Sequence, residues 1–307
     1  MKEKDRIMNE ETKSFLDLVY EYNPRQKSSI EKTIETYFSE DDFLQLRDIL
    51  RFYGKQFSTK EIADAYNLIV EDMATETKYF IENGKYRYSS FEEAEKLVYE
   101  NRDYMTKYMV GLGLSVYLWP NHIKTFHWFR DIMKNMSGEN YLEIGPGHGR
   151  YFCEAVNQSG FSVYDAIDVS EASVIQTSEY VKDYLDPDKQ KKCRIFRQNA
   201  YDYEPGKQYD LIVIAEVLEH LEKPAEMLEK LHSLGRENSY LYVTVPVNAP
   251  AIDHIYLFRT IEEVEDIVSK AGFEITDRLY APGGDMKLER AIKRNNTILV
   301  GLLAKKV

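Results

Sequence analysis

A short apolar run that breaks into a glycine-rich turn constrains the fold of this chain more than any other stretch. Tyr141–Ile144 has the apolar character of a buried strand, and Gly145, Gly147 and Gly149 follow it. Glycine has no Cβ atom to hold a ligand away from the backbone, and it adopts positive φ angles readily. The stretch therefore predicts a tight turn at the end of a strand, where a bound molecule can approach the main chain.

The sequence patterns on the two sides of this turn differ. Before it, apolar residues recur at helical spacing, and two capping-box signatures, Ser58-Thr-Lys-Glu61 and Ser90-Phe-Glu-Glu93, predict helix starts. The predicted helical segments are residues 9–22, 29–38 and 43–50, and two more that begin near residues 59 and 91. Pro24 closes the first of them. After the turn, strand and helix patterns alternate. The predicted strands are residues 141–144, 162–168, 193–198, 209–215, 240–245, 273–280 and 297–304, the last two forming a hairpin-like edge.

This order of elements predicts an α/β fold with a doubly wound, mostly parallel seven-stranded sheet, preceded by an all-helical N-terminal domain. We place the helical domain at residues 1–118 and the ligand-binding domain at residues 119–307, with Gly111–Pro120 as an apolar connector. The helical domain has two interpretations. It could be a lid that shapes the ligand pocket, and it could be a surface through which the chain forms a homodimer. Trp119 and His122 are candidate pocket residues beside the connector.

The charge balance and the cysteine content restrict the class of protein. The 40 Lys and Arg against 52 Asp and Glu give a net charge of −12, which disfavours binding to nucleic acid. No apolar run approaches the roughly 18–20 residues that span a bilayer, and the charged N-terminus lacks the apolar segment of a secretory signal. Two isolated cysteines, Cys153 and Cys193, suit a reducing compartment. We therefore expect a cytoplasmic protein that acts on a small molecule.

Glycine-rich turns also hold dinucleotides, but the G-x-G-x-x-G pattern of those enzymes is broken here by Arg150 at its sixth position. Three further motifs follow the turn in order. They are Ala166-Ile-Asp168-Val-Ser170 at the end of the second strand, Gln198-Asn199-Ala200 at the end of the third, and Tyr209–Leu221 along the fourth. Together with Glu143-Ile-Gly-Pro-Gly-His-Gly149, they make residues 120–307 resemble the class I S-adenosylmethionine-dependent methyltransferases.

The resemblance implies a binding site for S-adenosylmethionine. Asp168 would accept hydrogen bonds from both ribose hydroxyls, and Asn199 would face the adenine amino group, at a position where the family often has Asp. Tyr201 is expected beside the adenine ring. The full set of implied cofactor-binding residues is Glu143, Gly145, Pro146, Gly147, Asp168, Val169, Asn199, Ala200 and Ala215.

A second group of polar residues follows the fourth and fifth strands. Glu216-Val-Leu-Glu219-His220 comes directly after strand 209–215, and Asp253-His254 comes after strand 240–245. The carboxyl ends of parallel strands meet at one edge of a sheet, so we expect these side chains to converge. Their mixed oxygen and nitrogen donors suit Mg, Mn, Fe or Zn.

The pattern E-x-x-E-H with a downstream D-H is similar to that of the metal-dependent small-RNA 2′-O-methyltransferases, and the ubiquinone-pathway O-methyltransferases share E-x-x-E-H. The resemblance implies that Glu216, Glu219, His220 and His254 bind a divalent metal, which lowers the pKa of an acceptor oxygen. The predicted catalytic residues are Glu216, His220 and His254, and either histidine could instead be a general base. Without a metal, Glu219 would cap or orient the following helix, and His220 would pack or bind substrate.

The predicted function is methyl transfer from S-adenosylmethionine to a small-molecule acceptor in biosynthesis, with a hydroxyl oxygen as the favoured target. Three alternatives stay open at this point. They are 2′-O-methylation of RNA ribose, N- or C-methylation of a small metabolite, and a cofactor-binding subunit without catalysis.

Overall fold

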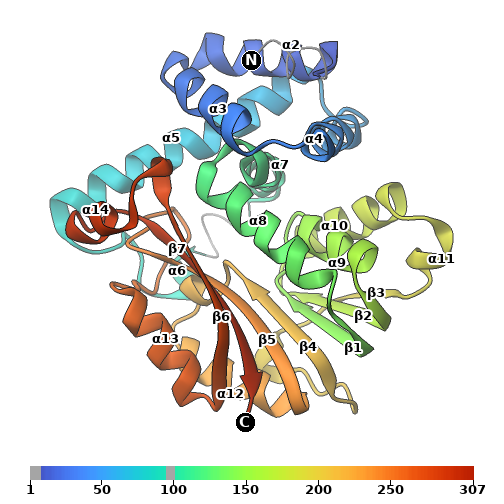
Figure 1. Ribbon diagram of the computed structural model, residues 1–307. Coiled ribbons are helices and arrows are strands. Elements are labelled where there is room, and N and C mark those ends of the chain that lie inside the picture. Colours follow the sequence, from blue (N-terminus) through green and yellow to red (C-terminus); the bar gives the residue numbers. More distant parts are fainter. Residues whose placement is uncertain (1–7, 95–100) are drawn as a thin grey trace.

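The computed structural model describes residues 8–94 and 101–307. The N-terminal helices, called here the helical arm (residues 8–94 and 101–118), lie over one end of a twisted sheet, and the C-terminus lies at the other end (Figure 1). The helices of the arm are α2 (Glu10–Tyr22), α3 (Pro24–Tyr37), α4 (Glu40–Tyr53), α5 (Thr59–Asn83), α6 (Phe91–Ala94) and α7 (Arg102–Leu118). Among the described residues, no helix is both long enough and apolar enough to cross a lipid bilayer.

The predicted seven-stranded sheet is confirmed, with the order β3-β2-β1-β4-β5-β7-β6. The first five strands are parallel, and β7 runs antiparallel to both of its neighbours. Because the strand order reverses between β1 and β4, a crevice is expected there, at the carboxyl ends of the parallel strands. The strands are β1 (Ser137–Ile144), β2 (Gly160–Asp168), β3 (Cys193–Arg197), β4 (Tyr209–Ala215), β5 (Gly235–Val247), β6 (Phe273–Pro282) and β7 (Ile298–Lys306).

Helices cover both faces of the sheet, and successive strand residues alternate between two apolar clusters. In β4, Leu211 and Val213 belong to one cluster, and Ile212 and Ile214 belong to the other. The first cluster continues without a break into the helical arm, so the arm and one sheet face share a single core. The remaining helices are α8 (Pro120–Met133), α9 (Arg150–Gln158), α10 (Glu171–Tyr184), α11 (Pro187–Gln190), α12 (Pro224–Leu234), α13 (Ile261–Lys270) and α14 (Leu288–Lys293).

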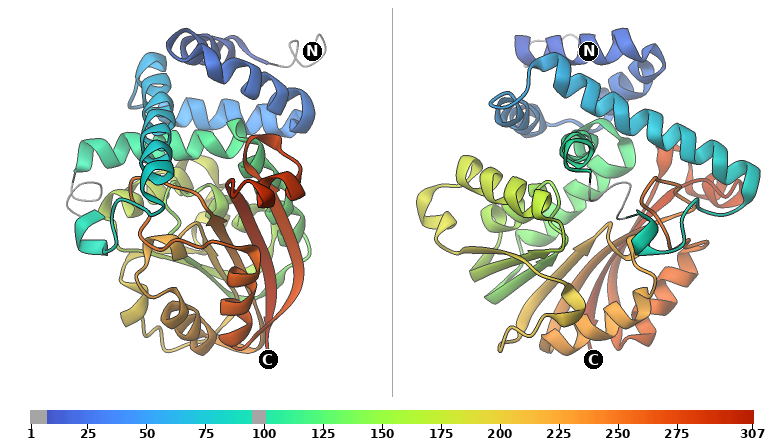
Figure 2. Two further views of the ribbon diagram at one scale, coloured as in Figure 1. Left: turned by 90° about the vertical axis from the view of Figure 1, so that its left-hand side faces the viewer. Right: turned by 180° about the vertical axis from the view of Figure 1, so that it is seen from behind.

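One prediction about the arm is wrong. Gly111–Pro120 is not a connector, because residues 111–118 form the second half of α7 and Pro120 opens α8. Both glycines let helices approach closely. A Cβ atom on Gly111 would lie 2.6 Å from the carbonyl oxygen of Ala65 on α5, and one on Gly113 would lie 2.2 Å from the Tyr53 hydroxyl on α4. Tertiary packing thus outweighs the low helix propensity of glycine. Figure 2 shows α5 and α7 crossing above the sheet.

Several element boundaries also differ from the prediction. β1 and β5 begin earlier, at Ser137 and Gly235, where polar residues hide the strand pattern. Pro24 ends α2 but also opens α3, since proline fits the first turn of a helix. The capping box at Ser58 is confirmed, with Glu61 closing it. The helix predicted to begin near residue 91 is described over Phe91–Ala94, residues 95–100 lie outside the described residues, and a separate helix, α7, begins at Arg102.

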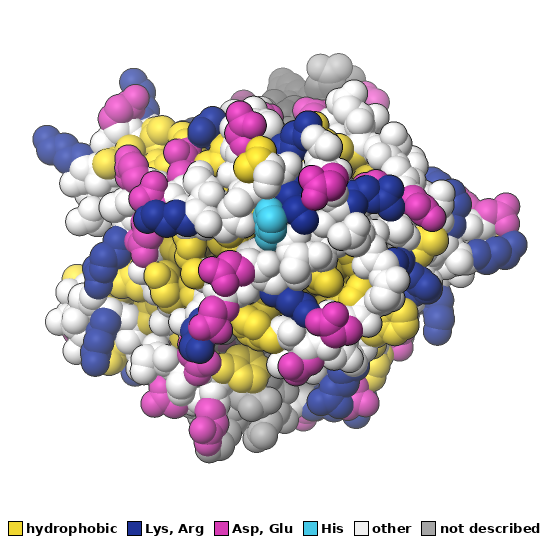
Figure 3. All heavy atoms as spheres, turned by 90° about the horizontal axis from the view of Figure 1, so that it is seen from below, with side chains coloured by type: hydrophobic (Ala, Val, Ile, Leu, Met, Phe, Trp, Pro, Cys, Tyr) yellow, Lys and Arg dark blue, Asp and Glu magenta, His cyan; other side chains and the backbone are white. Residues whose placement is uncertain are grey.

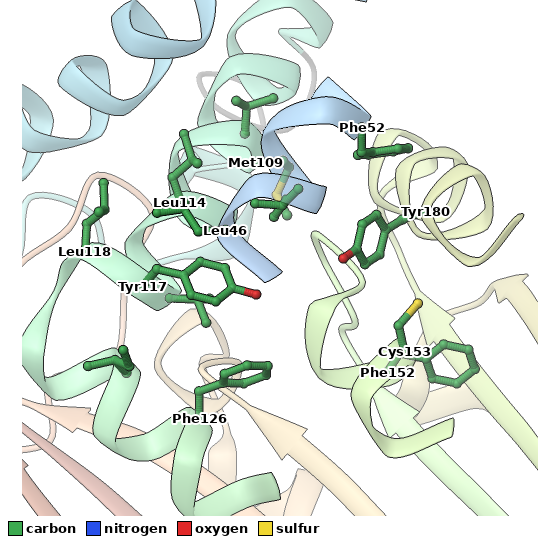
Figure 4. Close-up of a cluster of buried hydrophobic side chains, with 14 of the residues drawn as sticks. Leu46, Phe52, Met109, Leu114, Tyr117, Leu118, Phe126, Phe152, Cys153 and Tyr180 are labelled. Carbon is green, nitrogen blue, oxygen red and sulfur yellow. The ribbon is translucent and has the colours of Figure 1, made fainter. Parts of the chain in front are cut away.

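A buried arginine joins the arm to the sheet domain. Arg150, which opens α9 directly after the glycine turn, is fully buried and donates a hydrogen bond from Nη2 to Oε1 of Gln45 on α4, at 2.7 Å. It also donates to the hydroxyl of Tyr180 on α10 and lies over the rings of Tyr117 and Phe126. Figure 4 shows these aromatic side chains pointing toward one another between the arm and α9 and α10. The arm is therefore fixed against the glycine turn by a charged group as well as by apolar contact.

The end of the sheet away from the arm carries charges of both signs. Figure 3 shows Lys and Arg side chains interspersed with Asp and Glu across this face, without a continuous basic area. Such a mixture does not create the positive field that attracts a nucleic-acid backbone.

Candidate functional site

A cavity of about 260 Å³ lies between the helical arm and the carboxyl ends of the parallel strands. It occupies the crevice expected where the strand order reverses between β1 and β4. Every residue predicted to bind the cofactor, to bind a metal or to act in catalysis lines this cavity. They are Glu143, Gly145, Pro146, Gly147, Asp168, Val169, Asn199, Ala200, Ala215, Glu216, Glu219, His220 and His254.

The glycine turn forms one wall of the cavity. Gly145 and Gly147 have φ angles of 67° and 53°, in the left-handed region that disfavours other residues. A Cβ atom on Gly145 would lie 2.6 Å from Val217 Cγ2, and one on Gly147 would lie 2.9 Å from Cε of Met109 in the arm. Backbone conformation therefore favours glycine at both positions, and at Gly145 the short-branched Val217 adds a steric restriction.

Two acidic residues flank this turn at the ends of β1 and β2. Asp168 accepts a hydrogen bond from the backbone N–H of Ser170 at 2.8 Å, and burial raises the pKa of its carboxyl group to about 6. Glu143 is buried and accepts a hydrogen bond from the Tyr141 hydroxyl at 2.5 Å, and burial raises its pKa to about 8. Asp168 thus offers carboxylate oxygens to hydroxyl groups of a ligand, whereas Glu143 is held uncharged at neutral pH by its apolar surroundings.

The residues predicted near an adenine ring lie along the edge of the cavity at β3. Asn199 caps the short helix η2 (Ala200–Asp202), and its Oδ1 accepts the backbone N–H of Tyr201 at 3.0 Å. Ala200, Tyr201 and Val169 line the same edge. The amide oxygen of Asn199 keeps a second lone pair for a ligand amino group.

Glu216 follows β4 with a strained backbone. Its φ angle is 54°, an uncommon value for a residue with a long side chain and one that often marks a functional site. Its backbone N–H donates to Thr244 Oγ1 on β5 at 3.1 Å, and that hydroxyl in turn donates to Glu216 Oε1 at 2.8 Å. Burial raises the pKa of Glu216 to about 7, although the bond from Thr244 opposes this shift. Thr244 thus holds both the backbone and the carboxyl group in place.

Glu219, His220 and His254 form a compact cluster at the far end of the cavity. Each offers a donor atom, and the three atoms lie within 4.8 Å of one another. Glu219 and His220 lie on the short helix η3 (Leu218–His220), and His254 comes from the loop after β5. The Nε2 atoms of His220 and His254 lie 3.8 and 3.9 Å from Oε1 of Glu219.

The other ring nitrogens of the cluster are engaged with backbone carbonyl groups. His220 Nδ1 lies 3.0 Å from the carbonyl oxygen of Asp253, and His254 Nδ1 lies 2.6 Å from that of Ala249. A carbonyl oxygen can only accept, so both Nδ1 atoms carry the proton, and both Nε2 atoms lie on the side of Glu219. This is the arrangement by which proteins orient histidine ligands of a metal.

Glu219 itself lacks the partners that a buried carboxylate needs. Its side chain is fully buried, and neither oxygen accepts a hydrogen bond from another residue of the described chain. Burial, and then the neighbouring charge of Glu216, hold its pKa well above the usual range. An isolated buried carboxylate is costly, so this group requires either a proton or a cation beside it.

The helical arm contributes residues to the site that the sequence prediction missed. Tyr108 on α7 donates a hydrogen bond to Oδ1 of the buried Asp253 at 3.0 Å, and the ring of Tyr86 meets the ring of His254 edge to face. Helical spacing predicted Tyr108 on a helix, but that pattern could not show that its hydroxyl reaches Asp253.

The two candidate pocket residues beside α8 have different positions. His122 lines the cavity and lies 3.0 Å from the Ser115 hydroxyl, and burial lowers its pKa to about 4. Trp119 does not line the cavity, because its Nε1 donates to the Tyr66 hydroxyl inside the arm.

Comparison with known proteins identifies the fold and the domain. A family model described as a methyltransferase domain matches residues 126–278, whereas no curated protein matches the chain. Among solved structures, the N-methyltransferase NodS from Bradyrhizobium japonicum WM9, in complex with S-adenosyl-L-homocysteine, has a TM-score of 0.51 at 14% identity, covering 68% of this chain and 97% of that one. Magnesium protoporphyrin IX methyltransferase (ChlM) from Synechocystis PCC 6803, with bound S-adenosyl-L-homocysteine, has a TM-score of 0.49 at 16% identity, covering 61% and 84%. At such identities the likeness concerns the fold alone.

Proposed function

The chain is an S-adenosylmethionine-dependent methyltransferase with the class I fold, and we propose that it methylates a hydroxyl oxygen of a small-molecule acceptor with the help of a divalent metal. The observation that carries this proposal is the buried carboxyl group of Glu219. Neither of its oxygens accepts a hydrogen bond from another described residue, and the Nε2 atoms of His220 and His254 lie 3.8 and 3.9 Å from its Oε1.

The described residues fit S-adenosylmethionine at the β1 and β2 ends of the cavity. The turn at Gly145 and Gly147 leaves the backbone open to a ligand, and Asp168 offers two oxygens at the end of β2, where a ribose would lie. Asn199 and Ala200 supply the edge against which an adenine would lie. The cofactor supplies an electrophilic methyl group, and these residues bind and orient it.

The cluster of Glu219, His220 and His254 fits a divalent metal. One carboxylate and two imidazoles are a donor set that Zn, Fe, Mn and Mg accept to different degrees, and a cation would remove the cost of burying Glu219 without partners. Glu216 lines the same cavity and is the fourth predicted ligand. A bound metal would lower the pKa of an acceptor hydroxyl.

The protein residues then position the acceptor for the transfer. The two Nδ1–H groups fix both imidazole rings through backbone carbonyls, and Thr244 fixes Glu216. Alignment of an acceptor oxygen with the methyl group supplies much of the rate in such a reaction. His220 Nε2, if it is not a ligand, is the alternative acceptor for the hydroxyl proton.

Metal analysis of purified variants tests this proposal. We expect wild-type protein to hold a divalent metal, and Glu219→Gln and His254→Ala to lose it while the affinity for S-adenosylhomocysteine stays nearly unchanged. His232→Ala removes a histidine outside the cavity and is the matched control. Excess chelator should abolish turnover without releasing the cofactor. Full turnover in chelator, or equal metal content in all variants, would refute the metal role.

The atom that receives the methyl group is tested separately, by mass spectrometry and NMR of the product. An O-methyl ether is expected, and an N-methyl or C-methyl product would replace the hydroxyl proposal. RNA as the acceptor is disfavoured because no Lys or Arg is among the described residues that line the cavity.

A further inference from the structure

The helix α7 presents one continuous face to the cavity. Residues three and four apart lie on the same side of a helix, and the cavity-lining positions of α7 follow that spacing. They are Met105, Tyr108, Met109, Leu112, Ser115 and Val116. Because Met109 reaches to 2.9 Å from the point where a Cβ atom on Gly147 would lie, this face stands directly opposite the glycine turn. The wall facing the cofactor site is therefore mostly apolar.

Two more apolar residues extend this wall, and both come from the arm. Met73 on α5 and Phe91 at the start of α6 line the same cavity. Methionine is unbranched and polarizable, so Met73, Met105 and Met109 together make an apolar surface that adapts to the shape of a ligand. Elsewhere the lining is more polar, with Asp168 and Asn199 beside the glycine turn and Glu219, His220 and His254 in the cluster.

The described residues that line the cavity include acids but no Lys or Arg. Among them are five carboxylic acids, namely Glu143, Asp168, Glu216, Glu219 and Asp253. The two histidines nearest the arm and the glycine turn add no positive charge. Burial lowers the pKa of His122 to about 4 and that of His148 to about 3, so both are neutral at pH 7. Away from the proposed metal and the cofactor, a phosphate or carboxylate on the acceptor would lose its hydration without gaining a cationic partner from the described residues that line the cavity.

We propose that the acceptor is an uncharged molecule with an apolar body, which packs against the methionines of α5 and α7 and directs one oxygen toward Glu219, His220 and His254. This inference rests on the proposed function, because it takes the cavity to hold cofactor and acceptor together. It makes Met73, Met105 and Met109 residues that determine acceptor specificity.

Equilibrium binding to the full chain, saturated with S-adenosylhomocysteine, tests the inference. Two pairs of probes differ only in a remote carboxylate: 2-naphthol against 6-hydroxy-2-naphthoate, and 1-decanol against 10-hydroxydecanoate. We expect at least one neutral probe to bind about 10-fold or more tightly than its anionic partner, equivalent to about 1.4 kcal/mol. Equal or tighter binding of the anionic probes, or no binding of either neutral probe, overturns the inference.

A charge-introducing variant locates the preference within the cavity. Met73 is half-buried, so Met73→Lys can place an ammonium group at the cavity wall while its stem keeps the apolar contacts. The carboxylate probes should gain affinity in this variant. Met136→Lys makes the same charge change at a half-buried methionine outside the cavity. It should leave the ratio of neutral-probe affinity to anionic-probe affinity unchanged. If the ratio of neutral-probe affinity to anionic-probe affinity is the same in Met73→Lys and Met136→Lys, the inference is overturned.

The same probes separate this inference from the proposed function. Turnover with labelled S-adenosylmethionine is measured alongside binding. If the neutral probe binds as expected but an amine analogue, and not the alcohol, receives the methyl group, hydroxyl methylation is wrong while the acceptor class stands. Preferential binding of a short RNA over both neutral probes contradicts the acceptor class itself.

Discussion

Substitution of Gly145 by alanine tests whether the glycine turn is restricted by conformation, by space, or by both. Gly145 has a φ angle of 67°, and a new Cβ atom would lie 2.6 Å from Val217 Cγ2. Gly206 provides a matched control, because its φ angle is 66° and a Cβ atom there would meet nothing within 4 Å. The two substitutions thus share the backbone cost, and only the first adds a steric overlap inside the cavity.

The expected magnitudes follow from these two contributions. Left-handed backbone costs an ordinary residue about 1–2 kcal/mol, so Gly206→Ala should lower the free energy of unfolding by that amount. Overpacking adds about 1–3 kcal/mol, so Gly145→Ala should cost about 2–5 kcal/mol in total. Gly145→Ala should also weaken S-adenosylhomocysteine binding by about 10-fold or more, because relieving the overlap displaces the turn or Val217. Gly206→Ala should leave this affinity unchanged.

Urea unfolding followed by circular dichroism, with calorimetric titration of S-adenosylhomocysteine, measures both quantities. A double mutant provides the internal check. Val217→Ala removes the methyl groups that the new Cβ atom meets, so combining it with Gly145→Ala should cost about 1–3 kcal/mol less than the sum of the single changes. Equal destabilisation at Gly145 and Gly206 with unchanged cofactor affinity, or strict additivity with Val217, would refute the reasoning.

Four further predictions concern the arm and the residues that line the cavity. Arg150→Met keeps much of the packing but removes two charge-assisted hydrogen bonds. The free energy of unfolding, measured by thermal and urea unfolding, should therefore fall by about 2–4 kcal/mol. A variant as stable as wild type would contradict the linking role of this residue. Because burial raises the pKa of Asp168 to about 6, affinity for S-adenosylhomocysteine should rise as the pH increases from 5 to 7, and Asp168→Asn should remove that dependence in a titration series. Because the pKa of Asp168 is higher in the folded chain than in the unfolded chain, its contribution to the free energy of unfolding is complete below about pH 4 and is lost as the pH rises through 6. Urea unfolding without cofactor, measured at a series of pH values, tests this. Tyr108→Phe removes the hydrogen bond to Asp253, so kcat should fall while cofactor affinity holds, and an equal loss of both would point to a structural role instead.

The sheet domain could be predicted closely because each of its signals is local. The apolar run of β4 was predicted over the same residues that the structure shows, and the glycine turn lies at the end of β1 as expected. The residues predicted around Asp168 and Glu219 converge because parallel strands end at one edge, a rule that needs no knowledge of side-chain packing.

The contributions of the arm could not be predicted, because they depend on contacts between distant segments. Gly111 and Gly113 suggested a connector, yet they lie inside α7 where α5 and α4 approach closely. The bond from Tyr108 to Asp253 joins residues 145 positions apart, and nothing in the local sequence of either one indicates the other. The unpartnered oxygens of Glu219 are likewise visible only once the chain is folded.

The continuous core between the arm and the sheet determines what can be exchanged between related enzymes. The matched family segment begins at residue 126, in the middle of α8, so a chain cut there would lose α7 and half of the helix that joins it to the sheet. Transplanting the cavity wall of the arm would require moving α4, α5, α7 and α8 as one body, with Arg150 and its partner Tyr180 on α10 retained. The strands and the glycine turn could stay with the host, so the two sides of one cavity would come from different proteins.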